Sequence, residues 1–186
     1  MELLDSKTIR SEGAKAGLVF GTISGGYIFL SHWLSGMGNA GGIINFILEL
    51  GKIIGLILLM RHYMIALNTI YDEVDRRQTF RFGLYTAFFS ALITAACAYI
   101  FYAYAFPEAI QDVMETARQM MGSKMDSNTL RSLNDMENSF PTYAFVSYGL
   151  WCFIYGTLLS FILARTLPEG LMEEDEEEEE EEEDDE

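Results

Sequence analysis

The sequence has few of the residues that build disulfide scaffolds, metal sites or catalytic motifs. Its 186 residues include only two cysteines, Cys97 and Cys152, too few for a disulfide framework or a four-ligand zinc site. It has no phosphate-binding glycine loop, nucleophile elbow or metal-binding histidine motif. These absences favour a non-enzymatic protein, and we expect no catalytic residue, no metal and no cofactor.

Charge is scarce and nearly balanced outside the C-terminal tail. The formal net charge is −16, but residues 173–186 are all Asp or Glu, and the rest of the chain has 14 acidic against 12 basic residues. Without this tail the mean hydropathy rises to about +0.4, typical of a chain solvated largely by lipid. We predict a disordered acidic cytoplasmic tail at 167–186, because adjacent carboxylates repel one another. A nearly neutral body argues against nucleic acid as a partner.

Long apolar segments follow a short N-terminal segment, residues 1–15. A bilayer core of about 30 Å needs about 20 helical residues, and four segments meet this length. We therefore predict an all-α integral membrane protein, with an antiparallel bundle of four transmembrane helices within residues 16–166. The predicted spans are 16–34, 42–60, 82–106 and 142–164.

The distribution of Lys and Arg predicts the orientation of the bundle. Segments on one side of the predicted membrane hold eight of these residues, and segments on the other side hold three. The positive-inside rule then places both termini in the cytoplasm. Aromatic residues agree, because Tyr27, Phe29 and Trp33 close the first span at the expected outer interface.

Residues 107–141, between the third and fourth spans, are predicted to form an extracytoplasmic amphipathic helical hairpin. Pro107 should stop the third span, Gly122 should end the first hairpin helix, and Asp126 or Ser127 should cap a second, shorter one. Pro141 should then start the fourth span. The apolar faces of the hairpin either pack on each other and on the bundle, or contact a partner or lipid.

Small residues recur at every fourth position in three of the predicted spans. Helices in lipid associate through close backbone contact, which small side chains permit. These faces indicate intramolecular packing or, alternatively, a homo-oligomer interface. The small residues are Gly17, Gly21 and Gly25 in the first span, Gly83, Ala87 and Ala91 in the third, and Gly156 and Ser160 in the fourth.

The second span carries an intramembrane polar cluster of Asn45, Glu49 and Lys52. Their i, i+4, i+7 spacing places them on one face of a helix. A charge inside the membrane normally faces the bundle or water, with a partner in reach. Glu49 and Lys52 form either a structural ion pair, a site for an ion, proton or solute, or a subunit contact. Polar residues at similar depth are expected to line a small cavity with them: Thr86, Ser90, Thr94, Tyr99, Ser147 and Tyr148.

The layout resembles a bacterial membrane family called domain of unknown function 4199. The similar features are the basic loop from Asp72 to Arg77 running into Phe80-Arg81-Phe82-Gly83, Pro107-Glu108 with a Met-rich hairpin, and a Pro-led last span. The resemblance covers roughly residues 10 to 166 and implies a small multi-pass protein of the bacterial inner membrane. It implies no activity and no site residues, and the Glu49/Lys52 pair and the acidic tail are not typical of the family.

Two classes of function remain. A non-enzymatic membrane component that packs against another membrane protein or membrane lipid is favoured by the small-residue faces and the missing motifs. A small transporter or channel is the alternative, favoured by the polar site around Glu49 and Lys52. The lack of a visible inverted repeat weakens that alternative.

Overall fold

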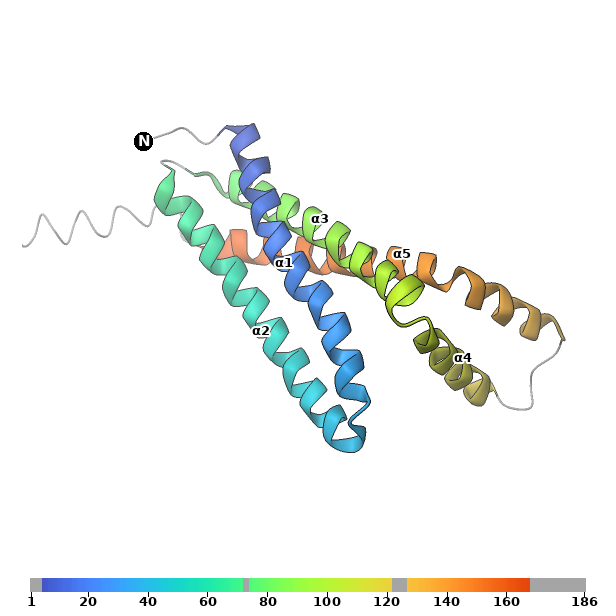
Figure 1. Cartoon of the computed structure of the whole chain (residues 1–186). Helices are drawn as coiled ribbons and strands as arrows, with labels where there is room; N and C mark the ends of the chain where they lie inside the picture. The colour runs from blue at the N-terminus through green and yellow to red at the C-terminus, as the bar shows by residue number, and fades with distance from the viewer. Residues whose placement is uncertain (1–4, 72–73, 122–126, 168–186) are drawn as a thin grey trace, which may run out of the picture.

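The computed structural model describes residues 5–71, 74–121 and 127–167, and every regular element in these ranges is helical. The predicted tail of 167–186 begins one residue too early, because Leu167 is buried against the bundle. The rest of the predicted tail, residues 168–186, lies outside the described residues, as do Gly122 and Asp126. The elements are α1 (Ser6–Ser35), α2 (Gly38–Ile70), α3 (Arg76–Ile100), the π-helix η1 (Phe101–Ala105), α4 (Glu108–Met121) and α5 (Ser127–Thr166) (Figure 1).

The helices extend beyond the apolar segments that predicted them. In α1 the helix begins at Ser6, whose backbone N–H donates to Asp5 Oδ1 at 2.6 Å. In α3 it begins at Arg76, and the backbone N–H of Asp75 donates to Gln78 Oε1 at 3.0 Å. Such capping satisfies backbone groups at the start of a helix, so these helices begin within polar and charged segments, earlier than the apolar pattern alone predicts.

Three helices of the described chain are long and apolar enough to cross a membrane. They are Gly41–Ile70, Arg76–Ala105 and Arg131–Thr166, whose most apolar stretches have mean hydropathies of 2.2, 1.8 and 1.7. The predicted first span is helical, but α1 is not among these three. Glycines occupy much of its packed face, and together with its Ser and Thr residues they lower its hydropathy, so composition supports three of the four predicted spans.

The four long helices converge at one end of the molecule. A buried cluster there joins Ile9 of α1, Met64 of α2, Phe82 of α3 and Leu163 of α5. Figure 1 shows the start of α1, the end of α2, the start of α3 and the end of α5 on the same side. The α1–α2 turn and the α4–α5 hairpin lie far apart at the opposite end, so the bundle is tight at one end and splayed at the other.

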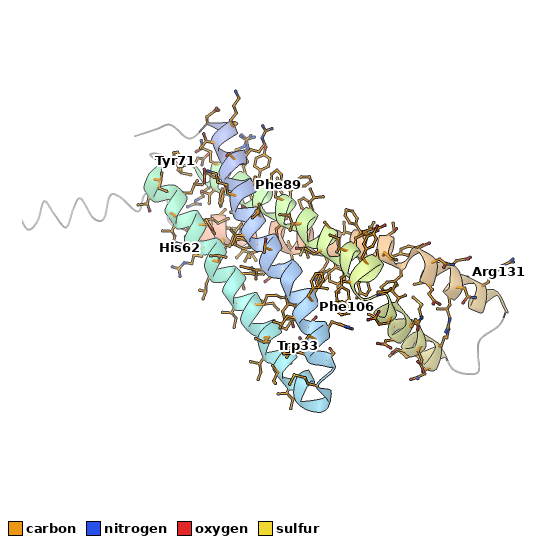
Figure 2. All side chains as sticks on the ribbon, viewed as in Figure 1. Trp33, His62, Tyr71, Phe89, Phe106 and Arg131 are labelled. Carbon is orange, nitrogen blue, oxygen red and sulfur yellow. The ribbon has the colours of Figure 1, made fainter. Side chains whose placement is uncertain are left out.

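The third helix ends in a π-helix beside an aromatic cluster. The backbone N–H of Phe106 donates to the Phe101 carbonyl oxygen at 2.8 Å, and Pro107 follows. The Phe101 ring lies 5.3 Å from the ring of Phe29 and 5.2 Å from His32, both on α1. Figure 2 shows Phe106 at this junction between α3 and α4. The prediction that the helix stops before Pro107 is confirmed.

In place of the predicted hairpin of two short helices, α4 packs against the beginning of one long helix, α5. Helix α5 runs unbroken from Ser127 to Thr166 with Pro141 inside it, so the prediction that Pro141 starts a new helix is wrong. Pro141 lacks the N–H that would bond to the carbonyl of Glu137. Packing on both sides keeps the helix continuous, because the Phe140 ring lies 4.9 Å from that of Tyr102 and Ala144 is buried.

The two arms of the hairpin pack on each other through their apolar faces. Ile110 and Met114 of α4 form a buried cluster with Leu133 of α5. Beside it, Arg118 Nη2 lies 3.3 Å from Glu137 Oε2 across the pair. The apolar faces therefore have an intramolecular partner, which was one of the two interpretations of the sequence.

Candidate functional site: a polar cavity within the bundle

The three polar residues predicted on α2 lie on one helical face, and two of them form an ion pair. Lys52 Nζ donates to Glu49 Oε1 at 2.9 Å. The Lys52 side chain is 19% exposed and the Glu49 side chain 47% exposed. The carboxylate thus lies at the edge of the site, while the ammonium is drawn inside.

Tyr27 of α1 contacts two of these residues, Asn45 and Lys52, and was not assigned to the cluster from the sequence. Its ring centre lies 3.8 Å from Lys52 Nζ, a cation–π geometry. Its hydroxyl lies 2.8 Å from Asn45 Oδ1 and donates to it. No spacing rule relates residues on different helices, and Tyr27 matched the pattern of an interfacial aromatic residue. The short turn after Ser35 brings it opposite Asn45.

The cluster faces a cavity of about 490 Å³ between α1, α2, α3 and α5. Such a volume lies within the range of small-molecule sites in proteins, about 300 to 1,000 Å³. Aromatic and apolar side chains supply much of its wall, and Glu49 and Lys52 are its only charged lining residues in the described chain. Other lining residues include Ser24, Ile28, Ile53, Leu56, Trp151, Cys152 and Tyr155.

The cavity contains part of the predicted polar lining. Thr94 and Tyr148 line it, whereas Tyr99 and Ser147 do not. At 100° per residue, Tyr99 lies about 140° around α3 from Thr94, and Ser147 about 100° around α5 from Tyr148, so neither faces the same way. Thr86 and Ser90 line a second cavity of about 40 Å³ nearer the convergent end.

The Thr94 hydroxyl is a polar atom with unused hydrogen-bonding capacity. Thr94 is 2% exposed. Its Oγ1 has no nitrogen or oxygen partner in the described protein and lies near the Cys152 thiol. Buried hydroxyls usually have a partner, supplied by the protein, by water or by a ligand.

The predicted small-residue faces hold α1, α3 and α5 together within one chain. A methyl group on Gly17 or Gly21 would lie 2.7 or 2.6 Å from the Cβ of Phe89 or Ile93 on α3. Gly13 and Gly25 make the same kind of contact, so the glycine face is one turn longer than predicted.

The opposite face of α3 contacts α5. A methyl group on Gly156 would lie 2.7 Å from Ala87 Cβ, Gly83 faces the Ser160 side chain, and Ala91 is buried. The sequence left open whether these faces pack within one chain or form a homo-oligomer interface. In the structure they make contacts within one chain.

Together these features define a helical protein with membrane-compatible helices around a polar cavity. The model of the family described as "Protein of unknown function (DUF4199)" matches residues 17–167. The chain belongs to this family, so the resemblance noted from the sequence is confirmed. No curated protein and no solved structure matches the chain.

Proposed function

We propose that this protein is a non-enzymatic, multi-pass component of the bacterial inner membrane that holds a lipid molecule in the cavity between α1, α2, α3 and α5. The observation that carries the proposal is the cavity itself. It combines aromatic and apolar walls with one small group of polar side chains, the composition expected of a site for an amphipathic molecule.

The proposed topology has four spans, with both termini in the cytoplasm. Support for α1 as a span comes from its packing, because Gly13 to Gly25 lie against Tyr85 to Cys97 of α3. That part of α3 belongs to a helix apolar enough to cross a membrane, so α1 would share its depth. The excess of Lys and Arg near the convergent end supports a cytoplasmic location for that end.

The position of the cavity fits access from the membrane. It is lined by α2 and α5, two helices with large exposed apolar side chains, and Trp151 of α5 is 74% exposed while lining it. In the four-span topology the cavity lies in the outer half of the membrane. An acyl chain would lie along Ile53 and Leu56, and the polar end of the lipid would lie near Glu49.

Native mass spectrometry of the full-length protein in mild detergent tests the proposal. Ile53→Trp would fill the cavity, whereas Ile54→Trp places the same ring on an exposed face of α2 that does not line it. We expect bound lipid on the parent and on Ile54→Trp, and little on Ile53→Trp. Equal retention by all three, or none by the parent, would contradict the proposal.

A small transporter or channel is the second candidate, supported by the ion pair at predicted membrane depth. Such a role requires a path past the convergent end, where Phe20, Met60 and Phe82 are buried together. Proteoliposomes with an internal pH-sensitive dye test proton movement. Proton uptake that exceeds that of empty liposomes and is lost in Glu49→Gln would favour this candidate. Proton uptake at the level of empty liposomes would exclude proton transport.

A further inference from the structure

We infer that the cavity recognises a zwitterionic group, in which one ammonium and one phosphate or carboxylate are carried close together. Glu49 would accept hydrogen bonds from the ligand ammonium, and Lys52 would donate to the ligand anion. The inference rests on the proposed binding role of the same cavity and adds the chemistry of the ligand's polar end.

The charge balance of the cavity is the first argument. Among the described lining residues there is one carboxylate and one ammonium, 2.9 Å apart. A singly charged anion bound to Lys52 would repel the Glu49 carboxylate and weaken its ion pair with Lys52. A singly charged cation bound to Glu49 would likewise repel the Lys52 ammonium and weaken the pair. Beside the apolar walls of the cavity, where water is only partly available, an unbalanced charge is disfavoured. A zwitterion adds one charge of each sign and leaves the site balanced.

The geometry of the pair leaves room for both contacts. Lys52 uses one of its three N–H donors on Glu49 Oε1 and presents its charge to the Tyr27 ring. A carboxylate has about four acceptor positions, and the Glu49 side chain is 47% exposed. A ligand can therefore bind beside the ion pair without separating it. The two charges of the ligand and the charges of Glu49 and Lys52 would then alternate in sign.

Neutral groups around the pair suit the anionic part of such a ligand. The Thr94 hydroxyl has no nitrogen or oxygen partner in the described chain. Tyr148 and Tyr155 also line the cavity, and each carries a phenolic hydroxyl. Phosphate and carboxylate oxygens accept hydrogen bonds from such donors, and these bonds are stronger than those between neutral groups.

This chemistry has two sources, a phospholipid with an ethanolamine head or the same head as a free solute. Phosphatidylethanolamine carries acyl chains that the apolar walls at Ile53, Leu56 and Trp151 would contact. Glycerophosphoethanolamine has the identical head without acyl chains. Comparing the two distinguishes a lipid from a solute.

The experiment is a competition measured by native mass spectrometry on the full-length protein in detergent. Equal amounts of phosphatidylethanolamine and anionic phosphatidylglycerol with the same acyl chains are added. We expect the parent to retain phosphatidylethanolamine in preference by about tenfold, a typical size for one charge contact in a partly exposed site. In parallel, glycerophosphoethanolamine is tested for its effect on thermal unfolding.

Two variants give the neutral cavity a net charge, positive in one and negative in the other. Glu49→Gln leaves Lys52 alone, so the preference should reverse toward phosphatidylglycerol, and Lys52→Met should reduce retention of both lipids. The matched control is the double variant Glu12→Gln/Lys15→Met. It removes an ion pair of the same i, i+3 spacing, Lys15 Nζ to Glu12 Oε1 at 2.6 Å, outside the cavity. The control should keep the preference of the parent.

Each outcome decides between the two proposals. Lipid bound without preference, in the parent and in Glu49→Gln alike, would overturn the zwitterion inference and leave the proposed lipid site standing. Stabilisation by glycerophosphoethanolamine without retained phospholipid would support the inference and overturn the lipid role. If the protein neither retains phospholipid nor is stabilised by glycerophosphoethanolamine, both proposals are overturned. Should a variant not fold, the competition on the parent alone decides the inference.

Discussion

Replacing Gly17 by alanine tests whether the glycine face of α1 holds α1 against α3. The added methyl group would lie 2.7 Å from Phe89 Cβ and 2.8 Å from the Thr86 carbonyl oxygen. Neither atom moves by a change of rotamer, so the two helices must separate. Reaching ordinary van der Waals contact, which begins at 3.4 Å, requires a shift of about 0.7 Å, and a gap of that size loses roughly a quarter to a half of the dispersion energy of the affected contacts.

The magnitude follows from two opposing effects. Overpacking of a close contact costs about 1 to 3 kcal/mol, and alanine is a better helix former than glycine by about 0.8 to 1 kcal/mol. Gly26 on the same helix is the matched control, because a methyl group there has no neighbour within 4 Å. Gly26→Ala should gain only the helix-propensity effect, so it should be more stable than Gly17→Ala by about 1 to 3 kcal/mol.

The assay is equilibrium unfolding of the purified protein in mixed detergent micelles, followed by circular dichroism. We expect Gly26→Ala to match or exceed the stability of the parent and Gly17→Ala to fall below Gly26→Ala. If Gly17→Ala is as stable as Gly26→Ala, the glycine face does not pack against α3 at this distance, and the arrangement of α1 on α3 is wrong.

Three further predictions concern topology, the tail and the ion pair. In a variant without native cysteines, an impermeant thiol reagent applied to intact cells should label a cysteine placed at exposed Ser132 and spare one at exposed Ser11; the reverse pattern would invert the topology. Deleting residues 173–186 should leave membrane insertion and melting temperature nearly unchanged, and a large loss of either would mean that the tail docks on the bundle. Glu49→Leu and Lys52→Leu should each destabilise by about 1 to 3 kcal/mol, less than for a fully buried pair, and the double variant should recover most of the loss; single variants that melt like the parent would contradict this.

Much of the helical structure was predictable, because helix length and the positions of small residues are local properties of the sequence. The stop before Pro107 and the faces containing Gly21 and Ala87 follow from backbone chemistry and the 3.6-residue period. The starts of α1, α3 and α5 and the end of α2 were predicted poorly, because hydropathy marks where a membrane would lie and not where a helix begins or ends. Pro141 shows the same limit, since tertiary packing around it holds α5 together.

The candidate site was predictable only within one helix. Asn45, Glu49 and Lys52 share a face of α2 by their spacing alone. The approach of Tyr27 to Lys52, and the cavity that both line, depend on how α1 and α2 are oriented relative to each other. A single sequence carries no direct information on that orientation.

The most apolar helix is the one that packs least, and this explains where the cavity lies. The most apolar part of α2 has a mean hydropathy of 2.2 and is 6% buried, whereas α3 with η1 has 1.8 and is 44% buried. In lipid, apolar side chains gain little by leaving their surroundings, so burial follows the small residues that let backbones approach. Helix α3 has such residues on two faces, and a methyl group on Gly51 or Gly55 of α2 would meet no neighbour within 4 Å. The N-terminal half of α2 is therefore held to the bundle largely by polar contacts of Asn45 and Lys52 with Tyr27, and the space beside these contacts remains open to a ligand.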